Sequence, residues 1–271
     1  MSVKSRRSLL FASGALLAVA AVAVPVVVGT AVADPASANQ PRIVGGHQAS
    51  LADHPYAVYL TDAGGNQFCG AVIVSSTSVA TAAHCAKAVA KQDIRVVAGR
   101  EDKRTGDGQV LGVSKVWVGQ GYTDPTKGGD IAVLTVRGQF DYRPAKLPDS
   151  SDAGLYAKGT QATVLGWGRI ADGGARSDYL RSAEVPVVSD SECRTDYDVY
   201  DQKTMVCAGY TEGGIDACQG DSGGPLVVGD TLIGIVSFGD GCAKANRPGV
   251  YTRVSTYAND IEGQAKPRLL G

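Results

Sequence analysis

The chain of 271 residues is long enough for one large domain or two small ones, and its formal net charge is −1. With lysines and arginines scattered along the chain, this balance excludes the basic composition typical of nucleic-acid-binding proteins. A hydrophobic content of 44% together with 35 glycines is typical of a loop-rich globular β protein.

The first 33 residues have the composition of a secretory signal peptide. Lys4, Arg6 and Arg7 precede an uncharged, alanine-rich stretch (8–32), and Ala31-Val32-Ala33 offers a small-residue cleavage site. A membrane anchor is the alternative, but Pro25 and the weakly apolar composition argue against a stable span. The paired arginines leave both general and twin-arginine export open. We therefore expect a secreted protein without a membrane anchor.

Short β-branched segments separated by turn residues follow, as in antiparallel barrels. The predicted strands are 56–60, 71–74, 94–98, 113–118, 131–136, 161–165, 181–188, 204–208, 225–228, 231–238 and 249–254. The polar stretch 137–150 divides them into two sets. Only the tail, 255 to about 263, is predicted to be helical, with Val254, Ala258 and Ile261 on one face.

A glycine-rich motif, Gly-Asp-Ser-Gly-Gly at 220–224, surrounds Ser222. Flanking glycines expose both the hydroxyl and the neighbouring backbone N–H groups. Serine is a weak nucleophile, so this interpretation requires a general base and a group that orients the base. The chain supplies His84 in Thr-Ala-Ala-His-Cys and Asp130 in Gly-Asp-Ile-Ala-Val-Leu.

With the order His84, Asp130, Ser222, these motifs resemble the chymotrypsin family, and in particular the trypsins that bacteria secrete. The resemblance runs from Ile43 to about Ile261. It implies an all-β fold of two six-stranded antiparallel barrels, about 43–145 and 146–262, with a short C-terminal helix. His84 and Asp130 would come from the first barrel and Ser222 from the second. It also implies a serine endopeptidase; the alternative is a catalytically silent, protease-like binding protein.

The family's catalytic roles carry over to these positions. His84 would accept the proton of Ser222 and later protonate the leaving amine, while Asp130 would orient the imidazole. The backbone N–H groups of Gly220 and Ser222 would form the oxyanion hole. The segment Ser237-Phe238-Gly239 would pair with the substrate backbone. Phe238 replaces the tryptophan common in trypsins, which we expect to loosen selection for neighbouring substrate residues.

The resemblance places Asp216 at the base of the primary specificity pocket, where a buried carboxylate needs a cationic partner. Gly239 and Gly249 would keep the pocket walls open, and Tyr251 would line the pocket behind them. Ala217 replaces a serine common in trypsins, so we expect a preference for arginine over lysine. The expected partners are peptide and protein substrates with Arg or Lys before the scissile bond, and proteinaceous inhibitors. We expect a monomer.

The segment 34–42 ends in Pro41-Arg42, and Ile43-Val-Gly-Gly follows it. In trypsins such an arginine is the activation site, so the resemblance implies a zymogen with propeptide 34–42 and peptidase domain 43–271. The freed ammonium of Ile43 would pair with Asp221.

Six cysteines allow 15 connectivities, so spacing leaves their pairing open. The family pattern implies Cys69–Cys85, Cys193–Cys207 and Cys218–Cys242, which suits an exported protein. A zinc site is the rival interpretation. A zinc site is disfavoured because no two cysteines lie two to four residues apart and because the chain has three histidines, His47, His54 and His84.

We expect no cofactor and no metal. The region between Gly99 and Val113, where animal trypsins hold calcium, is short here, and Glu101, Asp102, Asp107 and Asp130 lack a recognisable calcium spacing. The glycine-rich loop 170–177, with Arg169 and Arg176 beside it, is the expected site of self-digestion.

Overall fold

The computed structural model describes residues 45–266. The predicted signal peptide, the propeptide and Ile43 lie outside the described residues. Between 45 and 266, no helix combines the length and the apolar composition needed to cross a membrane.

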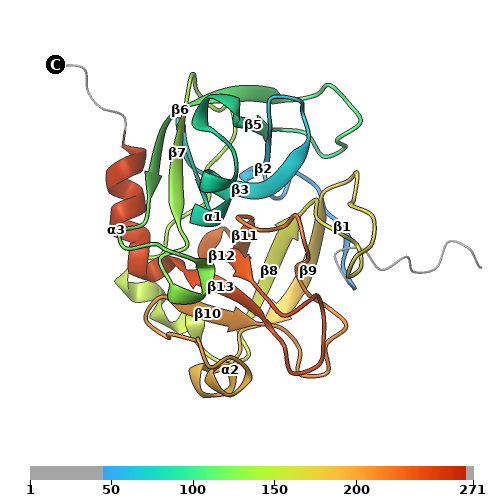
Figure 1. The fold of residues 1–271 in the computed structure, drawn as a ribbon, viewed down its shortest axis with the longest axis vertical. Helices are drawn as coiled ribbons and strands as arrows, with labels where there is room; N and C mark the ends of the chain where they lie inside the picture. The colour runs from blue at the N-terminus through green and yellow to red at the C-terminus, as the bar shows by residue number, and fades with distance from the viewer. Residues whose placement is uncertain (1–44, 267–271) are drawn as a thin grey trace, which may run out of the picture. The chain divides into compact units, whose positions relative to one another are not determined.

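The first half of the described chain forms a closed antiparallel barrel, the upper group of strands in Figure 1. Its strands are β2 (Ala57–Thr61), β3 (Gln67–Ser75), β4 (Ser78–Thr81), β5 (Arg95–Ala98), β6 (Gln109–Val118) and β7 (Ala132–Val136). The strand order is β2-β3-β4-β7-β6-β5. The four-residue β4 was missed in the sequence, because its polar ends do not alternate with apolar residues as a half-buried strand does; all four of its residues are buried.

The second half forms a sheet in the order β1-β9-β8-β11-β12-β13-β10. Its strands are β1 (His47–Gln48), β8 (Gln161–Gly166), β9 (Arg181–Pro186), β10 (Met205–Ala208), β11 (Pro225–Val228), β12 (Thr231–Phe238) and β13 (Gly249–Arg253). Just beyond β9, Val187 bridges Ala208 of β10, so the six longer strands close on themselves, and β1 adds to the outer side of β9. The expected two-barrel, all-β architecture is confirmed.

The expectation that only the tail is helical was wrong. Besides α3 (Val254–Ala265), the structure contains α1 (Ala83–Ala88) and α2 (Asp190–Asp196), and 3-10 turns at Lys91–Asp93, Pro125–Lys127 and Ser150–Tyr156. A capping box begins α2, since the Ser189 hydroxyl accepts the Glu192 amide and the Glu192 carboxylate accepts the Ser189 amide. The six-residue α1 is too short to produce a recognisable periodicity.

The two barrels share apolar packing. Tyr59 of β2 contacts Trp167, which follows β8, with ring centroids 5.0 Å apart. From α3, Val254 and Ile261 are fully buried and join the core cluster that both barrels share. The C-terminal helix therefore packs against β12 of the second barrel as well as against β3, β4 and β7 of the first.

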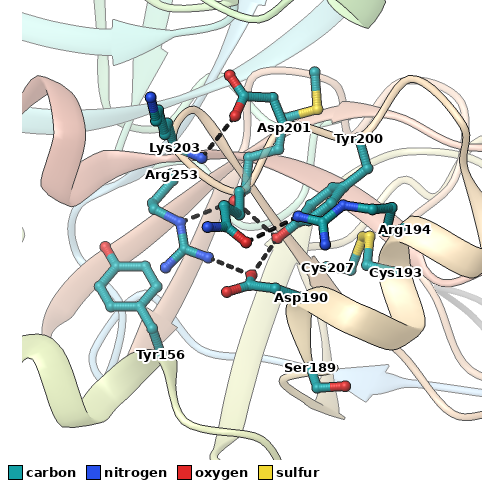
Figure 2. A network of polar contacts seen from close by, with 12 residues as sticks. Tyr156, Ser189, Asp190, Cys193, Arg194, Tyr200, Asp201, Lys203, Cys207 and Arg253 are labelled. Carbon is teal, nitrogen blue, oxygen red and sulfur yellow. Dashed lines mark hydrogen bonds and ion pairs between the residues drawn. A yellow bond between two sulfur atoms is a disulfide. The ribbon is translucent and has the colours of Figure 1, made fainter.

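A polar network fixes α2 beside the strands that carry the pocket (Figure 2). Arg253, at the end of β13, forms an ion pair with Asp190 at 2.9 Å and lies 4.8 Å over the ring of Tyr156. The Tyr200 hydroxyl donates to the same carboxylate at 2.5 Å, and the Cys193–Cys207 disulfide joins α2 to β10. These links anchor β13, whose first residues line the pocket described below.

Candidate active site

The imidazole of His84 and the carboxylate of Asp130 form a close pair. Nδ1 of His84 lies 2.8 Å from Oδ2 of Asp130, and the His84 amide donates to Oδ1 at 2.9 Å. That amide is free to do so because the first amides of a helix, here α1, lack intrahelical acceptors. Asp130 precedes β7 and is 1% exposed, whereas the His84 side chain is 28% exposed. Asp130 thus holds both the ring and the backbone of His84.

Two residues of the second barrel complete the surroundings of Asp130. The hydroxyl of Ser237, in β12, donates to Oδ2 of Asp130 at 2.6 Å. The Thr252 hydroxyl, from β13, donates to the main-chain carbonyl of Asp130 at 2.7 Å. From the sequence, Ser237 was expected only to pair with substrate, so its contact with Asp130 was missed. No local signal could have found it, because it depends on how the barrels meet.

Ser222 lies on a turn against the first barrel. Its main-chain carbonyl accepts the Gly70 amide at 2.8 Å. Sγ of Cys85 lies 3.4 Å from that carbonyl and 3.5 Å from Nε2 of His84. Nε2 of His84 and the main-chain carbonyl of Ser222 thus lie beside the same sulfur atom, which brings the imidazole next to the segment that carries Ser222.

The amides of Gly220 and Ser222 donate to no acceptor among residues 45–266. Gly220 has φ +100, in the region where glycine is favoured over residues with a side chain. Such free neighbouring amides can bind an oxyanion.

A pocket of about 230 Å³ adjoins Ser222. Among its lining residues are those expected from the sequence, namely Asp216, Ala217, Ser237, Phe238, Gly239, Gly249 and Tyr251. A Cβ at Gly249 would lie 2.8 Å from Oδ1 of Asp216, so a side chain there would block the pocket base. At Gly239 the nearest atom would be 3.5 Å away, which leaves that wall open.

Asp216 is an incompletely paired buried acid. It is 4% exposed; the Ala243 amide donates to Oδ2 at 3.2 Å, and Oδ1 has no hydrogen-bond partner among residues 45–266. Burial raises the pKa of Asp216 to about 7. The nearby hydroxyl oxygen of Tyr251 also has no hydrogen-bond partner within the described part of the chain. A buried, half-satisfied carboxylate in a pocket favours a cationic ligand.

Asp221 is fully buried beside the nucleophile segment. The Gly168 amide donates to Oδ1 at 2.7 Å and the Cys218 amide to Oδ2 at 3.0 Å. Burial still raises its pKa to about 6. Ile43, its expected partner, lies outside the described residues. The next described residue, Gly45, packs so closely on Ile215 that a Cβ there would lie 2.5 Å from Cγ1.

All six cysteines form the disulfides that the resemblance implies, with Cα separations of 6.1, 6.1 and 5.2 Å. Cys69, Cys85 and His84 cluster, but the two sulfurs are bonded to each other and cannot act as metal ligands. In the region considered for calcium, protein donors already bind two of the carboxylates. Glu101 accepts from Ser50 and Leu51, and Asp102 accepts from Arg104.

The family model described as Trypsin matches residues 43–261 of the chain. The chain belongs to the trypsin family. It is 47% identical to a trypsin of Saccharopolyspora erythraea, over 79% of this chain and 94% of that one. Identity to Trypsin 5G1 of Aedes aegypti is 42% over 79% and 82% of the two chains, and to Sus scrofa trypsin 35% over 82% and 94%. As a member of this family, the protein is a serine endopeptidase.

Proposed function

We propose that this trypsin-family protein cleaves peptide bonds after arginine, and less well after lysine. The observation that carries the proposal is the buried carboxylate of Asp216 in the pocket that adjoins Ser222, with Oδ1 unpaired among the described residues. A guanidinium or ammonium group would supply the missing donors and the opposite charge. Because Ala217 offers no hydroxyl, an ammonium lacks one partner, whereas the planar guanidinium can bind the carboxylate through two N–H groups.

We assign the chemistry to Ser222, His84 and Asp130. Ser222 attacks the scissile carbonyl, and His84 takes its proton and passes it to the leaving amine. Asp130 keeps Nδ1 protonated and stabilises the imidazolium, a role that the 2.8 Å contact supports. The free amides of Gly220 and Ser222 stabilise the oxyanion.

Replacement of the nucleophile tests this assignment. Ser222→Ala should abolish hydrolysis and labelling by a fluorophosphonate, while the protein still binds benzamidine, a cationic probe of the pocket. Adding His84→Ala to Ser222→Ala should lower the remaining rate of hydrolysis little further, because the triad acts as a unit. Turnover of Ser222→Ala above a few per cent of wild type would contradict the assignment.

We further propose that the protein is secreted and is made as a zymogen activated by cleavage after Arg42. The buried Asp221 supports this, since its carboxylate is held by two amides but has no cation within ion-pair distance among residues 45–266. The ammonium of Ile43 would supply that cation once Arg42 has been cut.

A further inference from the structure

On the other side of the oxyanion segment from the primary pocket lies a second cavity, of about 350 Å³. We call it the cationic pocket, because Arg100, Lys103 and Arg176 line it and no carboxylate of the described residues does. The other residues that line it are Tyr59, Thr61, Gly65, Asn66, Gln67, Val97 and Val110.

The side chains of the three cations donate to neutral oxygens rather than to carboxylates. Nε of Arg100 donates to the main-chain carbonyl of Asp107 at 2.7 Å, and Nζ of Lys103 to Oε1 of Gln67 at 2.7 Å. Arg176 donates to the Gln67 main-chain carbonyl. None of the three is within ion-pair distance of a carboxylate in the described range. At longer range Asp178 and the buried Asp221 act on Lys103, and Asp221 also acts on Arg176.

Some other surface cations of the protein do pair with carboxylates. Arg104 lies 2.7 Å from Asp102, and Arg143 lies 2.5 Å from Asp230. The nearest acidic turn to the pocket, at Asp62, uses its carboxylate on Asn66 and on the Gly64 amide. Because no carboxylate of the described residues pairs directly with these cations, Asp178 and Asp221 offset their charge only in part, and the cationic pocket favours an anion.

The cationic pocket adjoins the catalytic segment. Nε2 of Gln67 donates to the Gly220 carbonyl at 3.3 Å, and a Cβ at Gly220 would lie 3.3 Å from Nε of Arg176. Along β3, Gly70 touches Ser222, and Gln67 lies three residues further. At about 3.3 Å per residue, that is about 10 Å, the length of about three residues of extended peptide.

The direction of a bound substrate follows from the primary pocket. The substrate's arginine enters that pocket, and the residues before the arginine lie along 237–239. The residues after the scissile bond therefore leave Ser222 on the opposite side, toward Gln67. We propose that the cationic pocket receives an acidic side chain of the second or third substrate residue after the scissile bond. This inference rests on the proposed function. Val110, 51% exposed, offers an apolar contact for the methylene groups of such a side chain.

The test uses the processed enzyme and peptides based on its own activation sequence, residues 40–46, Gln-Pro-Arg-Ile-Val-Gly-Gly. Each of the three positions after Arg42 is replaced in turn, as in Val44→Glu and Val44→Gln. Glutamine is the neutral match of glutamate, so the ratio of the two kcat/KM values isolates the charge.

We expect a ratio of about five to ten at the second or third position, with the unsubstituted peptide cleaved at the rate of the Gln peptide. Arg100→Gln and Arg176→Gln should each lower the ratio two- to threefold, and the double variant should bring it near one. The preference should fall as salt rises, because the screening length shortens from about 10 Å at 0.1 M to about 3 Å at 1 M. Arg194→Gln is the control of equal charge; it lies on α2, which contributes nothing to this pocket, and bonds the neutral Gln202.

If Glu and Gln peptides were cleaved equally at all three positions while cleavage after arginine was intact, this inference would be overturned and the proposed function would stand. A preference that survives in the double variant would also overturn this inference. If the processed enzyme cut none of these peptides after arginine, the proposed function itself would fail, and this inference with it. A circular-dichroism spectrum and a melting temperature like those of the wild type verify that the variants are folded. Because the Glu-to-Gln ratio is taken within each variant, a change in its general activity cancels.

Discussion

Replacing Asp216 with asparagine should stabilise the protein against unfolding, and increasingly so as the pH rises. The wild-type carboxyl has a pKa of about 7 in the folded protein, raised by burial, against 3.8 for an unperturbed aspartate. The folded state therefore binds more protons than the unfolded state between these values, and stability falls as pH increases through this window. Because an asparagine amide does not titrate, Asp216→Asn should remove that pH-dependent loss.

The magnitude follows from the two pKa values. Each unit is worth about 1.4 kcal/mol. Deprotonation of Asp216 lowers the wild-type free energy of unfolding by about 2 kcal/mol at pH 5 and by about 4 kcal/mol at pH 8, relative to acidic pH. The stability difference between variant and wild type should therefore grow by about 2–3 kcal/mol between these pH values. The asparagine amide has its own burial cost, but that cost does not depend on pH.

Urea unfolding at pH 5 and pH 8 measures the free energy of unfolding of Asp216→Asn and of the wild type. Both proteins carry Ser222→Ala to prevent self-digestion. Asp230→Asn is the control. Arg143 lowers the pKa of Asp230, so its titration lies below 3.8 and its effect on the free energy of unfolding should be the same at both pH values. A growth of less than about 0.5 kcal/mol for Asp216→Asn would refute the conclusion that an uncompensated charge lies at the pocket base.

Three further outcomes are expected. Ser237→Ala removes a hydrogen bond to the buried Asp130, worth about 1.5–3 kcal/mol, so kcat should fall tenfold or more, and an unchanged kcat would contradict this. Ala217→Ser should raise kcat/KM for lysine peptides more than for matched arginine peptides, from a wild-type arginine preference of about tenfold; an unchanged ratio would disprove our account of the pocket floor. Arg42→Gln should yield an exported, inactive precursor. Full activity of the uncut Arg42→Gln protein would argue against activation by this cleavage. In the processed enzyme, Asp221 should raise the pKa of the new amino terminus above its reference of about 8. Activity should therefore persist below about pH 8 and fade as the pH rises through the raised pKa.

The chemistry and the family could be inferred from the sequence, because they are carried by short motifs. Ser222 among its glycines, His84 before a cysteine and Asp130 before a strand are each recognisable within a few residues. The disulfide pairing and the two barrels followed from the resemblance, not from spacing. The tail helix could be predicted because its 12 residues show the apolar face that packs on the core.

Tertiary structure alone decided which side chains meet across the two barrels. The Ser237 hydroxyl reaches Asp130 only because β12 of one barrel lies against the start of β7 in the other. Similarly, Arg100 and Arg176 are distant in the sequence, and nothing in their local residues indicates a shared pocket. A motif specifies the residue types that a reaction needs, whereas the direction of a side chain depends on strand register and on long-range packing, which no local pattern contains.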